Sequence, residues 1–128
     1  MILDTTFLID LYREARRGEE GPAVTFLAAH PEEPAHLSIV TVGEFAEGFP
    51  PSEKDLCADI LRHYALLDIT ESVGWKYAEI SRRLRARGER IGDNDLWIAA
   101  TALTHEYPLA TRNVADFRRI EHLRVISY

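Results

Sequence analysis

Short apolar runs alternate with longer stretches of helical period along most of the chain. The apolar runs predict buried strands at residues 1–3, 35–39, 65–69, 109–111 and 123–126. Between them, apolar residues recur at intervals of three and four and predict helices over 7–12, 22–29, 41–47, 52–64, 71–87 and 96–103, with the charged segment 13–21 as a loop. Alternating strands and helices are typical of an α/β protein, so we expect a central parallel sheet of about four to five strands with helices on both faces.

The predicted helix over 96–103 has the clearest apolar face. Leu96, Ala99, Ala100 and Leu103 recur at i, i+3, i+4 and i+7, and the small alanines allow close packing against a neighbour. We expect Asp93 to cap this helix and Asp95 to lie in its first turn, where free backbone N–H groups favour acids. Two acids at a helix start are common, so they indicate chemistry only if other acids join them.

Three further segments carry acids that follow predicted strands. Asp4 comes directly after the first strand, and Asn113 and Asp116 come after the fourth. Glu44 begins the helix after the second strand, although its spacing from Thr41 also fits a capping box, in which Glu44 would only bind a backbone N–H. Because ligands bind at the carboxyl ends of parallel strands, we expect these groups to converge at one edge of the sheet. Asp10, one turn into the first helix, is expected to be merely solvated.

Several carboxylates in one place repel each other unless a cation neutralises them. Oxygen ligands favour Mg²⁺ or Mn²⁺, which bind substrate phosphate and activate water for attack on a phosphodiester. Nucleophilic catalysis has little support, since the only cysteine, Cys57, lies within a helical pattern and no Ser-His-acid order is evident.

Composition narrows the class of protein. With 128 residues, we expect one domain over 1–128, and the single cysteine fits a cytoplasmic protein without a disulfide framework. The net charge of −6 argues against broad electrostatic binding of nucleic acid, but not against an enzyme that cuts it. Arginines at 82, 83, 85 and 87 are either a solvated helix end or a binding patch for phosphate or a partner. No targeting or membrane-spanning segment is visible.

Four segments in this order resemble the PIN domain, specifically the VapC toxins of toxin–antitoxin pairs. They are Met1-Ile2-Leu3-Asp4-Thr5, Thr41-Val42-Gly43-Glu44-Phe45, Asn94-Asp95-Leu96-Trp97-Ile98-Ala99-Ala100 and Thr111-Arg112-Asn113-Val114-Ala115-Asp116-Phe117. The resemblance implies a Mg²⁺-dependent endoribonuclease, with Mn²⁺ as a possible substitute. It makes Asp4, Glu44 and Asp95 the acidic triad that binds the metal, with Asp116 or Asn113 as the fourth group.

The same resemblance implies roles for neighbouring residues and for partners. Thr5 and Thr111 would orient ligands or the scissile phosphate, and Arg112 and Asn113 would position substrate. The family implies a homodimer, an RNA substrate and a VapB-like antitoxin that blocks the acidic site with a basic segment.

Two other interpretations stay open at this point. A phosphoacceptor or interaction module fits the size and the paired acids, although it needs a late lysine and the last one here is Lys76. An inactive PIN-like protein that only binds its partner is the second alternative.

Overall fold

The computed structural model describes residues 1–128 and contains one parallel sheet of five strands. The order of strands across the sheet is β3-β2-β1-β4-β5. Ile2 at the centre is in register with His36 on one side and with Leu109 on the other. The strands are β1 (Ile2–Leu3), β2 (His36–Ser38), β3 (Ala65–Leu67), β4 (Leu109–Ala110) and β5 (Val125–Ile126).

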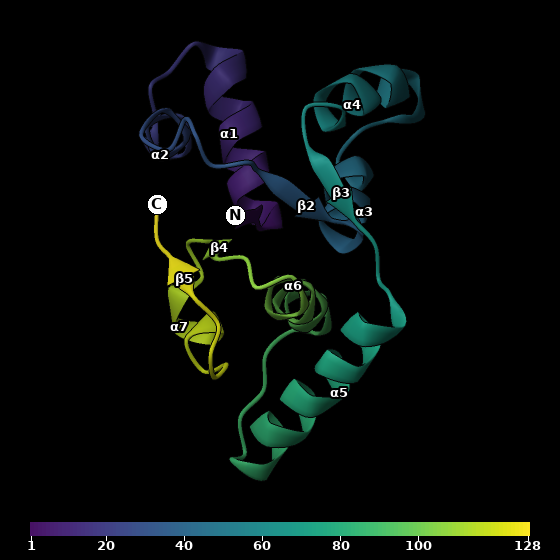
Figure 1. Cartoon of the computed structure of the whole chain (residues 1–128). Helices are drawn as coiled ribbons and strands as arrows, with labels where there is room; N and C mark the ends of the chain where they lie inside the picture. The colour runs from purple at the N-terminus through teal and green to yellow at the C-terminus, as the bar shows by residue number, and fades with distance from the viewer.

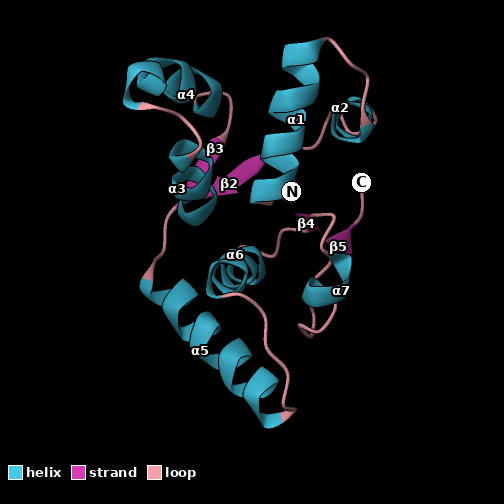
Figure 2. Ribbon diagram, turned by 180° about the vertical axis from the view of Figure 1, so that it is seen from behind, coloured by secondary structure: helices cyan, strands magenta, loops and turns pink.

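Seven α-helices and one 3₁₀ turn connect these strands and cover both faces of the sheet. Figures 1 and 2 show α1 and α2 on one side of the sheet and α5 and α6 on the other. The expected α/β fold is therefore confirmed. The helices are α1 (Thr5–Arg17), α2 (Pro22–Ala28), α3 (Ile39–Glu47), α4 (Lys54–Leu61), α5 (Glu71–Ala86), α6 (Asp93–Thr104) and α7 (Val114–Phe117), and the 3₁₀ turn is η1 (Pro51–Glu53).

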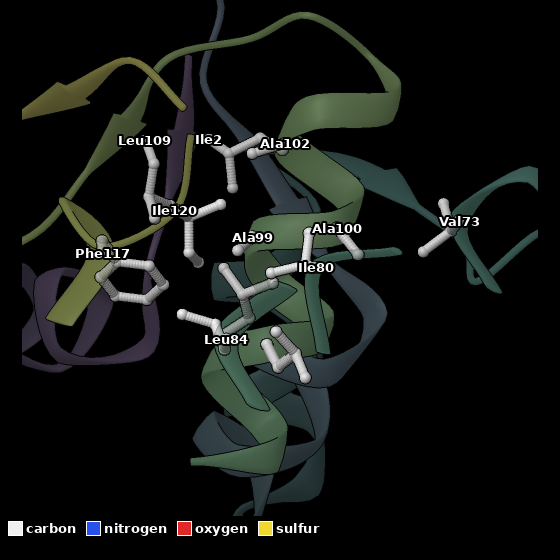
Figure 3. Packing of buried hydrophobic residues seen from close by; sticks show 12 residues of the cluster. Ile2, Val73, Ile80, Leu84, Ala99, Ala100, Ala102, Leu109, Phe117 and Ile120 are labelled. Atoms are coloured by element: carbon white, nitrogen blue, oxygen red, sulfur yellow. The ribbon is translucent and has the colours of Figure 1, made fainter. Parts of the chain in front are cut away.

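Consecutive strand residues contribute to different hydrophobic clusters, because side chains alternate across a strand. Ile2 and Leu109 pack in the cluster with α5, α6 and α7, whereas Leu3 and Ala110 pack in the cluster with α1, α2 and α3. Figure 3 shows the first cluster, in which Ala99 and Ala100 of α6 lie among larger apolar side chains. The alanine face predicted for this helix is thus buried in the core.

The order of strands creates a switch point between β1 and β4. The chain first steps outward from β1 to β2 and β3, and α5 and α6 then return it to β4 on the other side of β1. In open parallel sheets, a ligand crevice forms outside the carboxyl ends of the strands at such a point. Asp4 directly follows β1 and Thr111 directly follows β4, so both lie there.

Several predicted boundaries are wrong. The strand expected over 35–39 ends at Ser38, and α3 begins at Ile39 rather than at residue 41. The largest difference is in the first helix, which was expected to end at residue 12 but continues to Arg17. The charged residues of the expected loop form the exposed side of further turns of α1. Gly18 ends the helix with φ of 67°, a left-handed conformation that glycine adopts without strain, and its N–H bonds the carbonyls of Ala15 and Glu14.

Candidate active site

Four acids from distant parts of the chain lie near the switch point, where hydrogen bonds through Thr111, Asn113 and Asn94 connect them or their neighbours. We call them the acidic cluster: Asp4, Glu44, Asp95 and Asp116. Asp4 joins β1 to α1, and Glu44 lies on α3. Asp95 is in the first turn of α6, and Asp116 belongs to the short helix α7 after β4. The sequence-predicted acids are therefore brought to one region, including Asp95, whose helix follows no strand.

Asp4 is the most buried member, with 4% of its surface exposed. One carboxylate oxygen accepts the backbone N–H of Phe7 at 2.7 Å, so Asp4 is the N-cap of α1. The other oxygen accepts the hydroxyl of Thr111, which itself accepts the N–H of Asn113 at 2.9 Å. Thr111 thus connects the end of β1 to the turn after β4.

Glu44 is held by side chains that neighbour the other acids in sequence. The Thr5 hydroxyl donates to Oε2, and Asn94 Nδ2 donates to Oε1 at 2.7 Å. The capping-box interpretation of Glu44 is wrong, because Ser38 is the N-cap of α3 and accepts the Thr41 N–H at 3.0 Å. Glu44 therefore makes tertiary rather than local contacts.

Asn113 bridges the two remaining acids. Its Nδ2 lies 3.4 Å from Asp95 Oδ2 and 3.0 Å from Asp116 Oδ2, and it donates to both. Asp116 also pairs with Arg119 at 3.4 Å. The structure consequently places both sequence candidates for the fourth group, Asn113 and Asp116, beside Asp95.

The environment disfavours negative charge on two of these acids. Burial raises the pKa of Asp4 above its ordinary value and the charge of Asp95 raises it further, while the bonds from Thr111 and Phe7 lower it. Burial also raises the pKa of Asp95, and Glu44 and Asp116 add repulsion that the Asn113 bond partly offsets. No lysine or arginine forms an ion pair with Asp4, Glu44 or Asp95.

These donors fit a hard divalent cation by their chemistry. All are oxygens, which suits Mg²⁺ or Mn²⁺ better than a softer metal, and the mutual repulsion of the acids would be relieved by positive charge. As the side chains stand, no group of three or more Asp, Glu, His or Cys is arranged to hold a metal ion. Asp4, Glu44 and Asp95 instead accept hydrogen bonds from neutral hydroxyl and amide groups.

Two expectations about neighbouring acids are wrong. Gly92, not Asp93, is the N-cap of α6. Asp93 instead lies near Tyr77, where burial and the Asp93 carboxylate raise the pKa of the Tyr77 hydroxyl. Asp10 is not merely solvated, because it pairs with Arg112 at 2.9 Å and accepts the Tyr128 hydroxyl at 3.1 Å.

Sequence reasoning gave no role to Asn94, which the structure places on Glu44. The available signal was its position beside Asp95 in the first turn of α6, which brings an amide to the same helix end.

Within the arginine cluster at the end of α5, Arg83 and Arg87 pair with Glu121 at 2.7 and 3.3 Å. Those two arginines therefore have structural partners.

Comparison with known proteins gives the same family throughout. The PIN domain model matches residues 1–123. Ribonuclease VapC1 of Methanocaldococcus jannaschii is 30% identical over 129 residues, covering 100% of this chain and 86% of that protein. Ribonuclease VapC1 of Rickettsia felis is 30% identical over 135 residues, covering 99% and 95%.

A solved structure extends the likeness to three dimensions. A chain in the structure of VapBC-1 from nontypeable Haemophilus influenzae aligns with this one at a TM-score of 0.77 and 27% identity, covering 98% of this chain and 96% of that chain. No helix in this protein has the length and apolar character needed to cross a membrane.

Proposed function

The chain belongs to the PIN domain family, and from that premise we propose that it is a Mg²⁺-dependent endoribonuclease, the toxin of a VapBC-type pair. The observation that carries the proposal is the acidic cluster itself. Two of its carboxyl groups have raised pKa values, and three have no cationic partner, at the switch point where ligands bind in such sheets. The names of its relatives support ribonuclease activity in particular.

Asp4, Glu44 and Asp95 would hold the ion, and Mn²⁺ could replace Mg²⁺. When bound, such an ion polarises a phosphoryl oxygen and lowers the pKa of a water that attacks phosphorus. Thr111 and Asn113 keep the carboxylates of Asp4 and Asp95 in position through the bonds described above. Asp116 lies beyond Asn113 and contributes negative charge next to Asp95.

We also propose roles for two residues next to these acids, Thr5 and Arg112. Thr5 donates to Glu44, so it would orient that carboxylate. Arg112 is half exposed, is paired with Asp10, and lies 5.4 Å from the centre of the Tyr128 ring. A guanidinium has five N–H donors, so donors remain for a phosphate after the Asp10 contact is made.

The phosphoacceptor alternative is weakened by the position of the last lysine. Lys76 lies on α5, and its ammonium pairs with Glu79 at 2.9 Å. No lysine forms an ion pair with an acid of the cluster, so nothing there corresponds to the lysine that such a domain uses to bind phosphate.

The proposed partner is a VapB-like antitoxin, since a solved relative is a VapBC complex. A site with three unpaired carboxylates is complementary to a basic segment of such a partner. We further propose that the protein acts in the cytoplasm, where the free thiol of Cys57 would stay reduced.

We also propose a homodimer formed through the β3 side of the sheet. β3 is an edge strand, and large apolar side chains from β3 and the flanking elements are exposed: Leu56, Leu66, Ile69 and Trp75. Exposed apolar side chains beside an unpaired strand edge are typical of a protein–protein interface, because contact with water does not stabilise them in a monomer.

Incubation of the purified chain with structured RNA and Mg²⁺ or Mn²⁺ tests the activity. Discrete cuts are expected, and Asp4→Asn or Asp95→Asn should abolish them. Asp55→Asn is a matched control, because Asp55 also lies in the first turn of a helix but is exposed. Cleavage that persists in the Asp4 and Asp95 variants, or that is absent from the parent protein, would refute the proposal.

A further inference from the structure

A groove of about 500 Å³ lies between α1 and α3 and reaches the acidic cluster at Glu44. One wall is a single face of α1, since Ile9, Tyr12, Arg13, Arg16 and Arg17 recur at i, i+3, i+4, i+7 and i+8. The other wall is formed by Glu44 and Phe45 of α3 with the residues that follow this helix. The groove is thus continuous with the proposed site.

The α1 wall carries positive charge in an otherwise acidic protein. Arg13 and Arg16 are exposed and form no ion pair, and Arg17 contacts Glu19 only at 3.9 Å. Glu53 is the one acid on the opposite wall apart from Glu44. Three guanidinium groups therefore face one free carboxylate and the end of the acidic cluster.

Between the arginines and α3 lies a cluster of aromatic rings. The Tyr12 ring is 5.9 Å from Phe45 and 5.4 Å from Phe49, and the two phenylalanines are 5.0 Å apart. Tyr12 and Phe49 are only partly buried, whereas Phe45 is in the core. The groove is thus lined by two partly exposed aromatic rings and by exposed arginines.

We infer that this groove holds a single-stranded segment of the RNA substrate next to the cleavage site. Unpaired arginines bind phosphates, and partly exposed rings stack on bases, which is the combination that single-stranded nucleic acid requires. The inference rests on the proposed function, because the groove leads to Glu44. A strand bound along α1 would enter the acidic cluster from the Arg16 end and present its backbone there.

The test measures RNA binding separately from cleavage. A fluorescent, mixed-sequence single-stranded RNA of about 12 nucleotides is titrated in a chelating buffer against the Asp95→Asn protein, and anisotropy gives the affinity at several salt concentrations. Arg13→Gln with Arg16→Gln should lower the slope of log affinity against log salt by about 1.4, since each phosphate contact to a single strand contributes about 0.7.

The matched control is Arg82→Gln with Arg85→Gln. These arginines are also exposed, unpaired and three residues apart on a helix, so the net charge changes equally. Tyr12→Phe should bind as the parent does, whereas Tyr12→Leu should bind about fivefold or more weakly, because it removes the stacking surface. Circular dichroism melting of each variant checks that it is folded.

An unchanged salt slope in the α1 pair, or an equal loss in the α5 pair, would overturn the inference. The groove would then be left to a protein partner or to general charge attraction. If the groove variants bind and cleave RNA as well as the parent protein does, the inference about the groove is wrong and the proposed nuclease activity is retained. If the groove variants lose RNA binding but the parent protein cleaves no RNA, the proposed nuclease activity is wrong and the inference about the groove is retained.

Discussion

Replacing Thr111 with valine tests how the acidic cluster is held in place. Thr111 is fully buried, and its hydroxyl donates to Asp4 and accepts the N–H of Asn113 at 2.9 Å. Valine has nearly the same shape but makes neither bond. The substitution therefore removes one bond to a charged group and one to the backbone while the packing is kept.

The expected cost follows from these two bonds. A hydrogen bond to a charged group contributes about 1.5–3 kcal/mol and a neutral one about 0.5–1.5 kcal/mol, so Thr111→Val should lower the free energy of unfolding by about 2–4.5 kcal/mol. For a chain of 128 residues, about 1 kcal/mol corresponds to about 4 °C, so Tm should fall by about 8–18 °C. Thr111→Ser keeps both bonds and loses one methyl group, which costs about 1 kcal/mol.

The loss of stability caused by Thr111→Val should become smaller as the pH falls. The Thr111 bond lowers the pKa of Asp4 because it stabilises the charged carboxylate. The stabilisation by Thr111 is therefore fully present at neutral pH and lost as the pH falls through the raised pKa of Asp4 in the folded protein. Thermal melts of the parent, valine and serine proteins between neutral pH and pH 4 measure this. A valine protein as stable as the serine protein at neutral pH would refute the account of the cluster.

Three other substitutions test separate parts of the structure. Asp95→Asn should raise Tm in chelating buffer at neutral pH, because the fold raises the pKa of Asp95 and so disfavours its charge. This increase in Tm should become smaller as the pH falls through that raised pKa. Added Mg²⁺ should raise the Tm of the parent protein only. A gain that grows toward low pH would contradict this. Phe117→Ala should cost about 3–5 kcal/mol in urea unfolding, because Phe117 is fully buried in the core; a cost below about 1 kcal/mol would place that ring outside the core. Leu66→Glu should convert the proposed dimer to a monomer in analytical ultracentrifugation, and an unchanged mass would move the interface elsewhere.

Local patterns predicted most elements because each has its own signals in the chain. Thr70 is the N-cap of α5, as its position before a periodic apolar segment indicates, and its hydroxyl accepts the Val73 N–H at 3.3 Å. Asp4 after β1 and Asp95 in the first turn of α6 also lie where the pattern placed them. Convergence at the sheet edge followed from parallel strand order rather than from any single motif.

Tertiary contacts were beyond the reach of local patterns. Glu44 has capping-box spacing from Thr41, yet its carboxylate bonds Asn94, which is 50 residues away. Asp10 looked solvated because its partners Arg112 and Tyr128 come from the other end of the chain. The length of α1 was missed because charged residues on an exposed helical face resemble a loop in sequence.

Crystals grown with Mn²⁺ give the most direct test of the central claim, which is that the acidic cluster binds one divalent ion. An anomalous difference map should show a peak at about 2.0–2.3 Å from carboxylate oxygens of Asp4 and Asp95. The peak should disappear in crystals of Asp95→Asn grown in the same way. A Mn²⁺ peak elsewhere on the protein, or none beside Asp4 in a map with ordered carboxylates, would contradict the account.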